Sequence, residues 1–247
     1  FSIAFSIMDI SKDYFIEIPY IISNLDGYYI RSSILNAIKL NLNLLNGKLL
    51  DLGCGKMPYK KFILENSNVT DYVGLDIETA IEYSPEIKPD IRWDGVKIPF
   101  TNGEFDTIIM TEVMEHLSDP VRTLNEAGRV LKMDGILFFT VPFIWPLHET
   151  PFDEYRYTPF ALTRIFKEAG FSEIKLYALG GWHASLAQML GLWVRRSNMS
   201  KRKRRYLSIL LKPVIRYLIN KDSKPVHFGE GQMITGIFGM ASKSIVF

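Results

Sequence analysis

The sequence predicts an α/β fold in which a mainly parallel sheet carries helices on both faces. Three observations support this prediction. Short apolar segments alternate with segments of helical spacing through residues 47–180, a succession typical of βαβ units. Residues 104–112 carry apolar side chains on both faces of the predicted strand, as expected of a strand buried between two helix layers. No internal repeat interrupts this order, so we expect one domain.

The expected elements follow one another along the chain. Helices are predicted over 25–45, 58–67, 119–132 and 158–170, and strands over 48–53, 71–78, 88–94, 104–112, 134–142 and 171–179. Asn46–Gly47 is placed to close the first helix. Asp119 and Thr158, each followed by a proline, are placed to open the third and fourth helices. A last strand over 232–243 is expected to return to the same sheet.

The composition is that of a globular protein, with 47% hydrophobic and 23% charged residues. Cys54 is the only cysteine, which excludes an internal disulfide and favours a reducing compartment. No stretch reaches the roughly 20 apolar residues of a membrane span. The apolar opening, residues 1–10, lacks a basic region and a cleavage site, so a signal peptide is not expected. We therefore predict a cytoplasmic protein.

Positive charge is concentrated near the C-terminus. Residues 195–224 contain 11 basic residues and one acid, Asp222, for a net charge of +10, and the remaining 18 basic and 26 acidic residues give −8. The densest tract is KRKRR at 201–205. The chain is thus an acidic globule with a basic appendage.

A glycine-containing turn follows the first predicted strand, in the sequence KLLDLGCGKMPY (48–59). Gly53 and Gly55 let the backbone approach a ligand without interference from a Cβ atom. Ligands of open α/β sheets lie at the carboxyl ends of strands, where this turn is expected. Pro58 replaces the third glycine of a dinucleotide fingerprint, and Met57 stands where a Walker loop has Ser or Thr. Neither pyrophosphate-binding loop fits.

Three aspartates end the first three strands. Asp51 precedes the glycines and suits a ligand with an ammonium group. Asp76, at the end of the second strand, can accept hydrogen bonds from ribose hydroxyls. Asp94, at the end of the third, can accept from an adenine amino group. The three acids fit an adenosine that carries an amino acid better than a dinucleotide.

Taken together, these segments resemble the class I S-adenosylmethionine-dependent methyltransferases. LLDLGCG is similar to the first motif of the family, YVGLDIE to the second, WDGVKIPFTNGEFDTIIMTEVMEHLSDP to the third and fourth, and AGRVLKMDGILFFTVP to the helix and strand that follow. Five motifs in order, over roughly residues 47–180, carry the resemblance. GCGxxPY and LHETPFDEYRYTP are similar to type-11-like members of polysaccharide and lipid-linked sugar pathways.

The resemblance implies a Rossmann-like fold with a seven-stranded, mostly parallel sheet of order 3-2-1-4-5-7-6, and S-adenosyl-L-methionine as cofactor. The implied cofactor site is Asp51, Gly53, Cys54 and Gly55 at the methionine moiety, Asp76 and Ile77 at the ribose, Asp94 and Gly95 at the adenine, Thr111 near the sulfonium and His116 at the floor. Met57 stands where many members have a third glycine. The chain then divides into an N-terminal helical cap (1–46), a cofactor-binding core (47–180), a basic helical insertion (181–230) and a final strand (231–247).

A polar segment after the fifth strand offers residues for the methyl acceptor. His148, Glu149, Tyr155 and Arg156 lie in PLHETPFDEYRYTP, where a strand's carboxyl end should receive the acceptor. We predict His148 as the general base because its ordinary pKa lies near working pH. Arg156 and the tyrosines would hold a polar or anionic acceptor. The alternative is a surface loop whose charges satisfy one another.

The sequence EVMEH (112–116) is similar to the ExxEH of quinone O-methyltransferases, in which a divalent ion assists. The alternative, which we favour, is that His116 packs at the floor of the cofactor pocket. No metal site is therefore predicted. Cys54 is expected to line the pocket, not to act as a nucleophile.

The predicted function is S-adenosylmethionine-dependent methyl transfer to an oxygen of a sugar or lipid-linked saccharide. The alternatives are methylation of a quinone or another small molecule, and a non-catalytic S-adenosylmethionine-binding module that docks to membrane or nucleic acid.

The basic insertion combines cations with apolar helical faces. Trp182, Leu186, Met189, Leu190 and Trp193 recur at helical spacing, and residues 206–219 are apolar nearly all round. This pattern favours peripheral contact of residues 195–224 with the anionic inner face of a membrane. A lid or homodimer contact is the alternative. Nucleic acid is less suited, because phosphates do not reward buried leucines.

Overall fold

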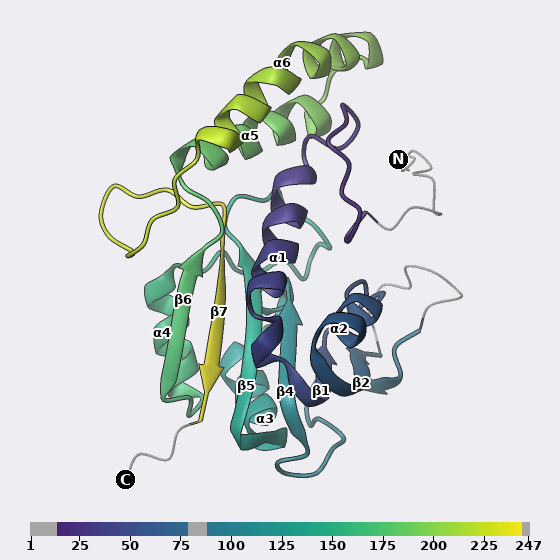
Figure 1. The fold of residues 1–247 in the computed structure, drawn as a ribbon, viewed down its shortest axis with the longest axis vertical. Helices are drawn as coiled ribbons and strands as arrows, with labels where there is room; N and C mark the ends of the chain where they lie inside the picture. Colours follow the sequence, from purple (N-terminus) through teal and green to yellow (C-terminus); the bar gives the residue numbers. More distant parts are fainter. Residues whose placement is uncertain (1–13, 79–87, 244–247) are drawn as a thin grey trace.

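One sheet organises the computed structural model, which describes residues 14–78 and 88–243. Its strand order is β3-β2-β1-β4-β5-β7-β6 (Figure 1), which confirms the predicted order. The strands are β1 (Asn46–Leu52), β2 (Asn68–Ile77), β3 (Ile91–Trp93), β4 (Phe105–Thr111), β5 (Leu131–Pro142), β6 (Glu173–Ala178) and β7 (Gly236–Ser242). Strands β1 to β5 pair in parallel, and β7 runs antiparallel to β5 and β6.

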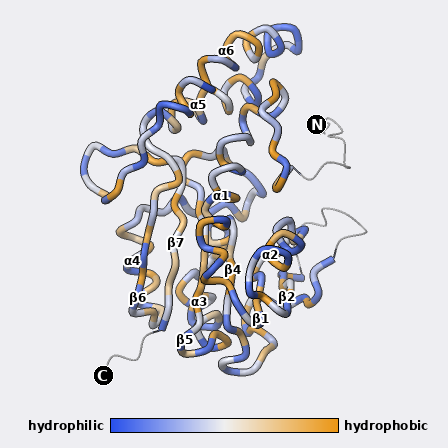
Figure 2. The backbone as a smooth tube through the Cα atoms, in the orientation of Figure 1, coloured by the Kyte–Doolittle hydropathy of each residue, from blue (hydrophilic) through white to orange (hydrophobic). Residues whose placement is uncertain are grey.

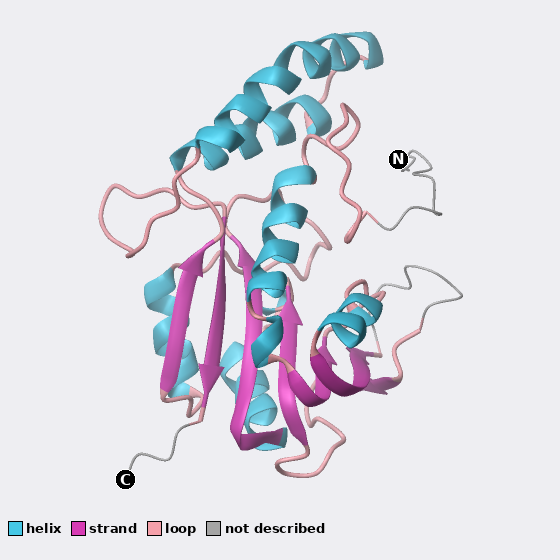
Figure 3. Ribbon diagram, viewed as in Figure 1, coloured by secondary structure: helices cyan, strands magenta, loops and turns pink. Residues whose placement is uncertain are grey.

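Helices cover both faces of the sheet. They are α1 (Tyr28–Leu40), α2 (Lys60–Asn66), α3 (Pro120–Val130), α4 (Pro159–Glu168), α5 (Trp182–Arg196) and α6 (Lys201–Lys221), with 3-10 turns η1 (Leu42–Leu44) and η2 (Met114–His116). Helix α1 lies in front of the sheet in Figure 3, and α3 and α4 lie behind it.

The two apolar cores follow from the alternation of side chains along each strand. In β1, Leu50 and Leu52 pack with α3 and α4, whereas Leu49 packs with α1 and α2. In β4, Ile108 belongs to the first core and Ile109 to the second. All five side chains are at most 2% exposed. Burial of each contributes about 1.5–3 kcal/mol to folding, so the central strands hold the sheet edge that carries the site.

Two predicted helix starts are confirmed. The Asp119 side chain accepts a hydrogen bond from the amide of Arg122 at 3.0 Å, and the Thr158 hydroxyl accepts from the amide of Ala161 at 3.2 Å. Each cap satisfies one of the unpaired amides at a helix N-terminus.

The predicted end of the first helix was wrong. Helix α1 ends at Leu40, and Asn46–Gly47 begins β1 instead of closing the helix. Asn41 ends the helix because its side-chain amide donates to the Ala37 carbonyl at 2.8 Å and its backbone amide to the Ile38 carbonyl at 3.0 Å.

Helices α5 and α6 form an antiparallel pair at one end of the molecule, between β6 and β7 in sequence (Figure 1). Leu25, Ala187, Val194, Ile215 and Leu218 form a separate small core between them and the N-terminal segment. The insertion predicted at 181–230 contains both helices. The parts of the predicted cap and final strand at 1–13 and 244–247 lie outside the described residues.

Two acids tie the helix pair together and to the N-terminal segment. Asp222 accepts hydrogen bonds from the amides of Gly181 and Ala184, both at 2.9 Å, and so caps the start of α5. Asp26 pairs with Arg196 at 2.9 Å. Within the described ranges, no helix has the length and apolar character needed to cross a bilayer.

Candidate functional site

Two adjoining cavities open at the carboxyl ends of β1, β2 and β4. Cavity A, of about 330 Å³, is lined by Leu52, Gly53, Gly55, Asp76, Ile77, Trp93, Glu112, Val113, His116, Leu117, Thr123, Glu149, Thr150 and Phe152. Cavity B, of about 440 Å³, is lined by Phe15, Ile30, Arg31, Ile34, Gly53, Cys54, Gly55, Lys56, Pro58, Tyr59, Thr111, Glu112, His116, Trp145, His148 and Glu149. The lining residues common to both are Gly53, Gly55, Glu112, His116 and Glu149. The two cavities therefore share a wall.

The glycine loop forms part of that shared wall. Gly53 has a φ of 74°, and a Cβ added to it would lie 2.6 Å from Cγ2 of Val113, so only glycine fits without displacement. Its amide and that of Cys54 donate to the Leu75 carbonyl at 2.8 and 3.2 Å, which ties the loop to β2. Met57 adopts a φ of 51°. The loop thus keeps a glycine-like conformation at the position where the chain has no glycine.

Asp76 connects the end of β2 to the glycine loop. Its carboxylate accepts hydrogen bonds from the amides of Gly55 at 2.9 Å and Ile77 at 2.8 Å. Burial raises the pKa of Asp76, although these two hydrogen bonds favour the ionised form. Asp76 and Ile77 both line cavity A, where the sequence predicted them to meet the ribose.

The other two predicted acids line neither cavity. Asp51 is 3% exposed and accepts a hydrogen bond from the Tyr72 hydroxyl at 2.6 Å. Strand alternation directs it toward the face covered by α1 and α2, to whose core Tyr72 belongs. Burial raises the pKa of Asp51 to about 7, against the effect of the Tyr72 hydrogen bond. The structure thus places Asp51 beside the glycine loop but outside both cavity linings, and its contact with the methionine moiety stays a prediction.

Asp94 lies in the exposed loop after β3. One of its carboxylate oxygens accepts from the amides of Val96 and Lys97 at 2.8 and 3.2 Å, which holds the pKa of Asp94 below its ordinary value. Gly95, with a φ of 77°, continues this turn and also lies outside the cavity linings. The local turn uses the carboxylate that was predicted to reach the adenine.

Apolar side chains form the remaining wall of cavity A. Ile77, Trp93, Val113 and Leu117 come from the ends of β2 and β3 and from the segment after β4. An aromatic base fits between such side chains. Of these four residues, only Ile77 was predicted from the sequence. Trp93 and Val113 could have been predicted as well, because Trp93 lies near the end of the predicted strand 88–94 and Val113 directly follows the predicted strand 104–112.

Glu112 separates the two cavities and was not among the predicted site residues. It has a φ of 56°, its amide donates to the Thr140 carbonyl at 3.1 Å, and its carboxylate accepts from the Thr140 hydroxyl at 2.8 Å. Burial raises the pKa of Glu112 to about 7. Its position directly after β4 placed it at the ligand-binding edge.

His116 lines both cavities and lies near two other side chains that can bind metal ions. Ligand atoms of Glu115, His116 and His148 lie within 4.8 Å of one another. Glu115 is fully buried, and its carboxylate has no hydrogen-bond partner among the described residues. Burial, followed by the nearby Glu112, raises the pKa of Glu115 well above its ordinary value. A carboxyl that stays protonated is a poor metal ligand.

His148 and Glu149 line cavity B, as the sequence predicted for the acceptor site. The His148 ring Nδ1 lies 3.2 Å from Oδ2 of Asp153, and the His148 amide donates to the same oxygen at 3.1 Å. Burial lowers the pKa of His148, while Asp153 works to raise it. The imidazole is therefore neutral near pH 7, with Nδ1–H donated to Asp153 and Nε2 left as the acceptor.

Tyr155 and Arg156 line neither cavity, in contrast to their predicted contact with the acceptor. Arg156 donates to both oxygens of Asp153, at 2.6 and 2.8 Å, and to the carbonyls of Tyr155, Trp145 and Pro146. Tyr155 stacks on Tyr157, with ring centroids 5.1 Å apart. The side chains of Tyr155 and Arg156 therefore fix the conformation of the polar segment 146–159.

The outer part of cavity B combines aromatic rings with cations. Its lining includes Trp145, Tyr59 and Arg31. The guanidinium of Arg196, from α5, lies 4.7 Å from the centroid of the Trp145 ring. The helix pair therefore contacts a residue of the cavity wall. Cys54 and Thr111 also line this cavity, and burial raises the pKa of the Cys54 thiol, which disfavours a thiolate.

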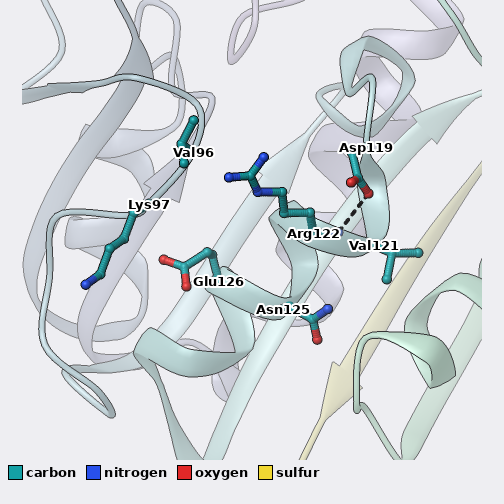
Figure 4. Close-up of a pocket in the computed structure, with 7 residues that line it drawn as sticks. All are labelled: Val96, Lys97, Asp119, Val121, Arg122, Asn125 and Glu126. Atoms are coloured by element: carbon teal, nitrogen blue, oxygen red, sulfur yellow. Dashed lines mark hydrogen bonds between the residues drawn. The ribbon is translucent and has the colours of Figure 1, made fainter.

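A third cavity, of about 560 Å³, lies beside α3 and is lined by Val96, Lys97, Asp119, Val121, Arg122, Asn125 and Glu126 (Figure 4). Its acids are already used within the protein. Glu126 accepts from the Ile98 amide at 2.9 Å and pairs with Arg129 at 2.7 Å. Asp119 caps α3 (Figure 4). This cavity contains none of the predicted site residues.

Cavity A fits the expected cofactor. Gly53 and Gly55 have no side chain that would keep a ligand away from the backbone of the loop. Asp76 can accept hydrogen bonds from the ribose hydroxyls, and the apolar end of the cavity suits the adenine. These described residues are the ones that would hold S-adenosylmethionine.

Comparisons with known proteins agree with this geometry. The methyltransferase domain family matches residues 26–176. A tRNA U34 carboxymethyltransferase from Campylobacter fetus is 33% identical over 119 residues, which are 44% of this chain and 41% of that protein. A demethylmenaquinone methyltransferase from Staphylococcus saprophyticus is 23% identical over 56% of this chain and 76% of its own length. The chain thus matches less than half the length of the carboxymethyltransferase.

Solved structures share the fold. A SAM-dependent methyltransferase from Thermotoga maritima aligns with a TM-score of 0.55 at 15% identity, over 90% of this chain and 92% of its own. One from Archaeoglobus fulgidus aligns with a TM-score of 0.53 at 16% identity, over 89% and 96%. The matched family, the strand order and the glycine loop lead to one conclusion: the chain belongs to the class I S-adenosylmethionine-dependent methyltransferases.

Proposed function

We propose that this enzyme methylates a hydroxyl oxygen of a sugar or lipid-linked saccharide. One observation carries the proposal: cavity B shares a wall with the cofactor cavity and contains a histidine oriented by a buried carboxylate. The Asp153 side chain is fully buried, whereas the His148 side chain is 22% exposed and can reach an acceptor.

The protein's task is to position the acceptor and take its proton. When bound, the cofactor supplies an electrophilic methyl group on a sulfonium that leaves readily. A neutral hydroxyl needs a general base to react at neutral pH. His148 has a neutral ring and a free Nε2, so it would accept the hydroxyl proton while Asp153 stabilises the imidazolium that forms. Glu149 and Glu112 would bound the acceptor on the side of cavity A.

The walls of cavity B support a saccharide. Trp145 and Tyr59 offer aromatic surfaces, and Arg31 and Lys56 offer cationic donors. Sugar rings present apolar faces to aromatic side chains and hydroxyl edges to charged groups, and a phosphate-bearing sugar would in addition attract the cations. A polar acceptor is also consistent with the mixture of Glu149 and His148 on the same wall.

A quinone is the second candidate. A ubiquinone biosynthesis O-methyltransferase from Xanthomonas oryzae is 27% identical over 47% of this chain. Ile30, Ile34 and Phe15 give cavity B one apolar side that suits such a ring. The non-catalytic alternative predicts cofactor binding with no methyl transfer to any acceptor.

The test is transfer of a labelled methyl group from S-adenosylmethionine to a panel of soluble glycans, lipid-linked saccharides, quinones and tRNA. We expect label in the saccharides and loss of at least about 100-fold in kcat for His148→Gln, with S-adenosylhomocysteine affinity unchanged. Label confined to quinones or to tRNA would contradict the proposed acceptor. Full activity of His148→Gln would contradict the proposed base.

A further inference from the structure

We propose that the outward face of α6 docks this enzyme on an anionic lipid surface. The docking surface, here called the α6 outer face, consists of an apolar stripe and of exposed cations in the first turns of the helix. The stripe is Tyr206, Leu210, Val214 and Tyr217, and the cations are Lys201, Arg202, Lys203 and Arg205. Figure 1 shows α6 at the top of the molecule, beyond the upper end of the sheet.

The apolar part of the α6 outer face forms a continuous stripe. Its four residues are spaced by three or four positions, so they share one side of the helix. They are between 44% and 68% exposed. The buried residues Ser208, Ile215 and Leu218 occupy the other side and pack toward α5 and the N-terminal segment. The four side chains of the stripe therefore do not pack in the core of the protein.

Cations lie at the N-terminal end of the stripe, where Figure 2 colours α6 as hydrophilic. Lys201, Arg202, Lys203 and Arg205 are all exposed. Across the described ranges, no ion pair joins any of these four to an acid. Asp222, the acid nearest in sequence, already caps α5, and Asp26 already binds Arg196. A partner for this face must therefore supply negative charge.

An anionic bilayer surface matches both properties at once. Tyrosines and aliphatic side chains insert at the level of the headgroups, while flanking cations attract anionic lipids. Nucleic acid would satisfy the cations but would leave the stripe without apolar contact. A second copy of the chain would cover the stripe but would bring an equal number of cations against it. The membrane is the occupant that both observations favour.

Docking at this face would also place the methylation site. Arg196 at the end of α5 lies 4.7 Å from the Trp145 ring centroid, and Trp145 lines cavity B. Only residues 197–200 separate α5 from α6. A docked α6 would hold cavity B close to the headgroups, where a lipid-linked acceptor presents its sugar. This second step rests on the proposed function; the docking itself does not.

The test is co-sedimentation of the full chain with vesicles of phosphatidylcholine, with and without phosphatidylglycerol. We expect binding only to the anionic vesicles, weakening as salt is raised. Tyr206→Ser/Leu210→Ser/Tyr217→Ser and Lys201→Gln/Arg202→Gln/Lys203→Gln should each reduce binding at least about tenfold. The matched control Lys61→Gln/Lys167→Gln/Lys175→Gln removes three exposed cations elsewhere and should bind like the unmodified protein. S-adenosylhomocysteine affinity, unchanged in every variant, shows that each is folded.

Several outcomes would overturn the docking proposal. One is equal loss of binding in the control variant, which would indicate net charge alone. Another is tRNA binding that the lysine and arginine changes abolish but the serine changes do not. A third is a dimer in solution that the serine changes dissociate, with no vesicle binding by the unmodified protein. Vesicle binding without methylation of any saccharide would instead contradict only the proposed acceptor.

Discussion

His148 Nδ1 lies 3.2 Å from Oδ2 of Asp153, and Arg156 holds both oxygens of that carboxylate at 2.6 and 2.8 Å. The three residues form a chain from the interior to cavity B. Arg156 fixes Asp153, and Asp153 fixes the ring of His148 with Nε2 available to the acceptor. This arrangement would orient His148 for the general-base role that we propose.

Replacing Asp153 with Asn should lower activity and move its pH dependence. Asp153 raises the pKa of His148 against the larger effect of burial. Without the negative charge, the pKa of His148 falls further, so the acid limb of kcat moves to lower pH. Loss of orientation should reduce the plateau by about 10- to 100-fold.

The measurement is kcat as a function of pH for the original protein and Asp153→Asn. S-adenosylhomocysteine affinity serves as the control, because Asp153 lines neither cavity. An unchanged acid limb together with an unchanged plateau would exclude the proposed pair.

Replacing Arg156 with Leu should destabilise the protein near neutral pH by about 2 kcal/mol, since a buried carboxylate loses its partner. Burial works to raise the pKa of Asp153, but hydrogen bonds from Arg156 and His148 lower it to about 2. An acid with a depressed pKa stabilises the fold above its ordinary pKa, and this contribution is lost as pH falls toward about 2.

Urea unfolding at neutral and acidic pH measures this effect. The stability difference between the original protein and Arg156→Leu should shrink as pH is lowered from about 5 toward the pKa of Asp153. A difference that stays constant over that range would show that Arg156 acts through packing alone.

Replacing Gly53 with Ala should abolish tight cofactor binding. The added Cβ would lie 2.6 and 2.7 Å from the two methyl groups of Val113, at a φ of 74°. The loop must shift, and S-adenosylhomocysteine affinity should fall by about tenfold or more. Gly170→Ala is the matched control, since Gly170 has a φ of 83° but nothing within 4 Å of an added Cβ. Equal affinities in the two variants would contradict the predicted role of the Gly53 position in cofactor binding.

Cofactor affinity should depend on the ionisation of Glu112. Burial raises the pKa of Glu112 to about 7, and Glu112 lines both cavities. As pH rises from about 6 to about 8 the carboxylate forms, so affinity for the cationic S-adenosylmethionine should rise relative to S-adenosylhomocysteine. Glu112→Gln should remove this pH dependence. A ratio of affinities that is constant with pH in the original protein would contradict the assignment.

Chelating agents should leave methyl transfer unchanged. The carboxyl of Glu115 is buried and favours its protonated form, which is a poor metal ligand. The cluster of Glu115, His116 and His148 is thus expected to act without a metal ion. Loss of activity on chelation, restored by added zinc or magnesium, would show that this cluster holds one.

The fold was predictable because its signals are local. A few neighbouring residues are enough to predict the helix caps at Asp119 and Thr158 and the strand within 104–112. Asp76 and the two loop glycines were predictable for a related reason, since every parallel strand ends at the same edge of the sheet. The end of α1 was missed because Asn41 and Asn46–Gly47 offer equally good stop signals in sequence.

The differences between the predicted site and the cavity linings share a tertiary cause. Asp51 ends a predicted strand, but its hydrogen bond with Tyr72, 21 positions along the chain, depends on the pairing of β1 with β2. Arg156 is a plausible acceptor contact until Asp153 and three carbonyls are seen to use its donors. The position of Glu112 between the cavities depends on a hydrogen bond from the Thr140 hydroxyl on the neighbouring strand β5.

The most direct test of the site is calorimetric titration with S-adenosylhomocysteine of the original protein, Asp76→Ala and Asp94→Ala. Asp76 lines cavity A and anchors the glycine loop, so its loss should weaken binding by about tenfold or more. Asp94→Ala should change affinity much less, and NADH should give no heat with any of the three. Undiminished binding by Asp76→Ala, or binding of NADH in its place, would contradict the assignment of cavity A to the cofactor.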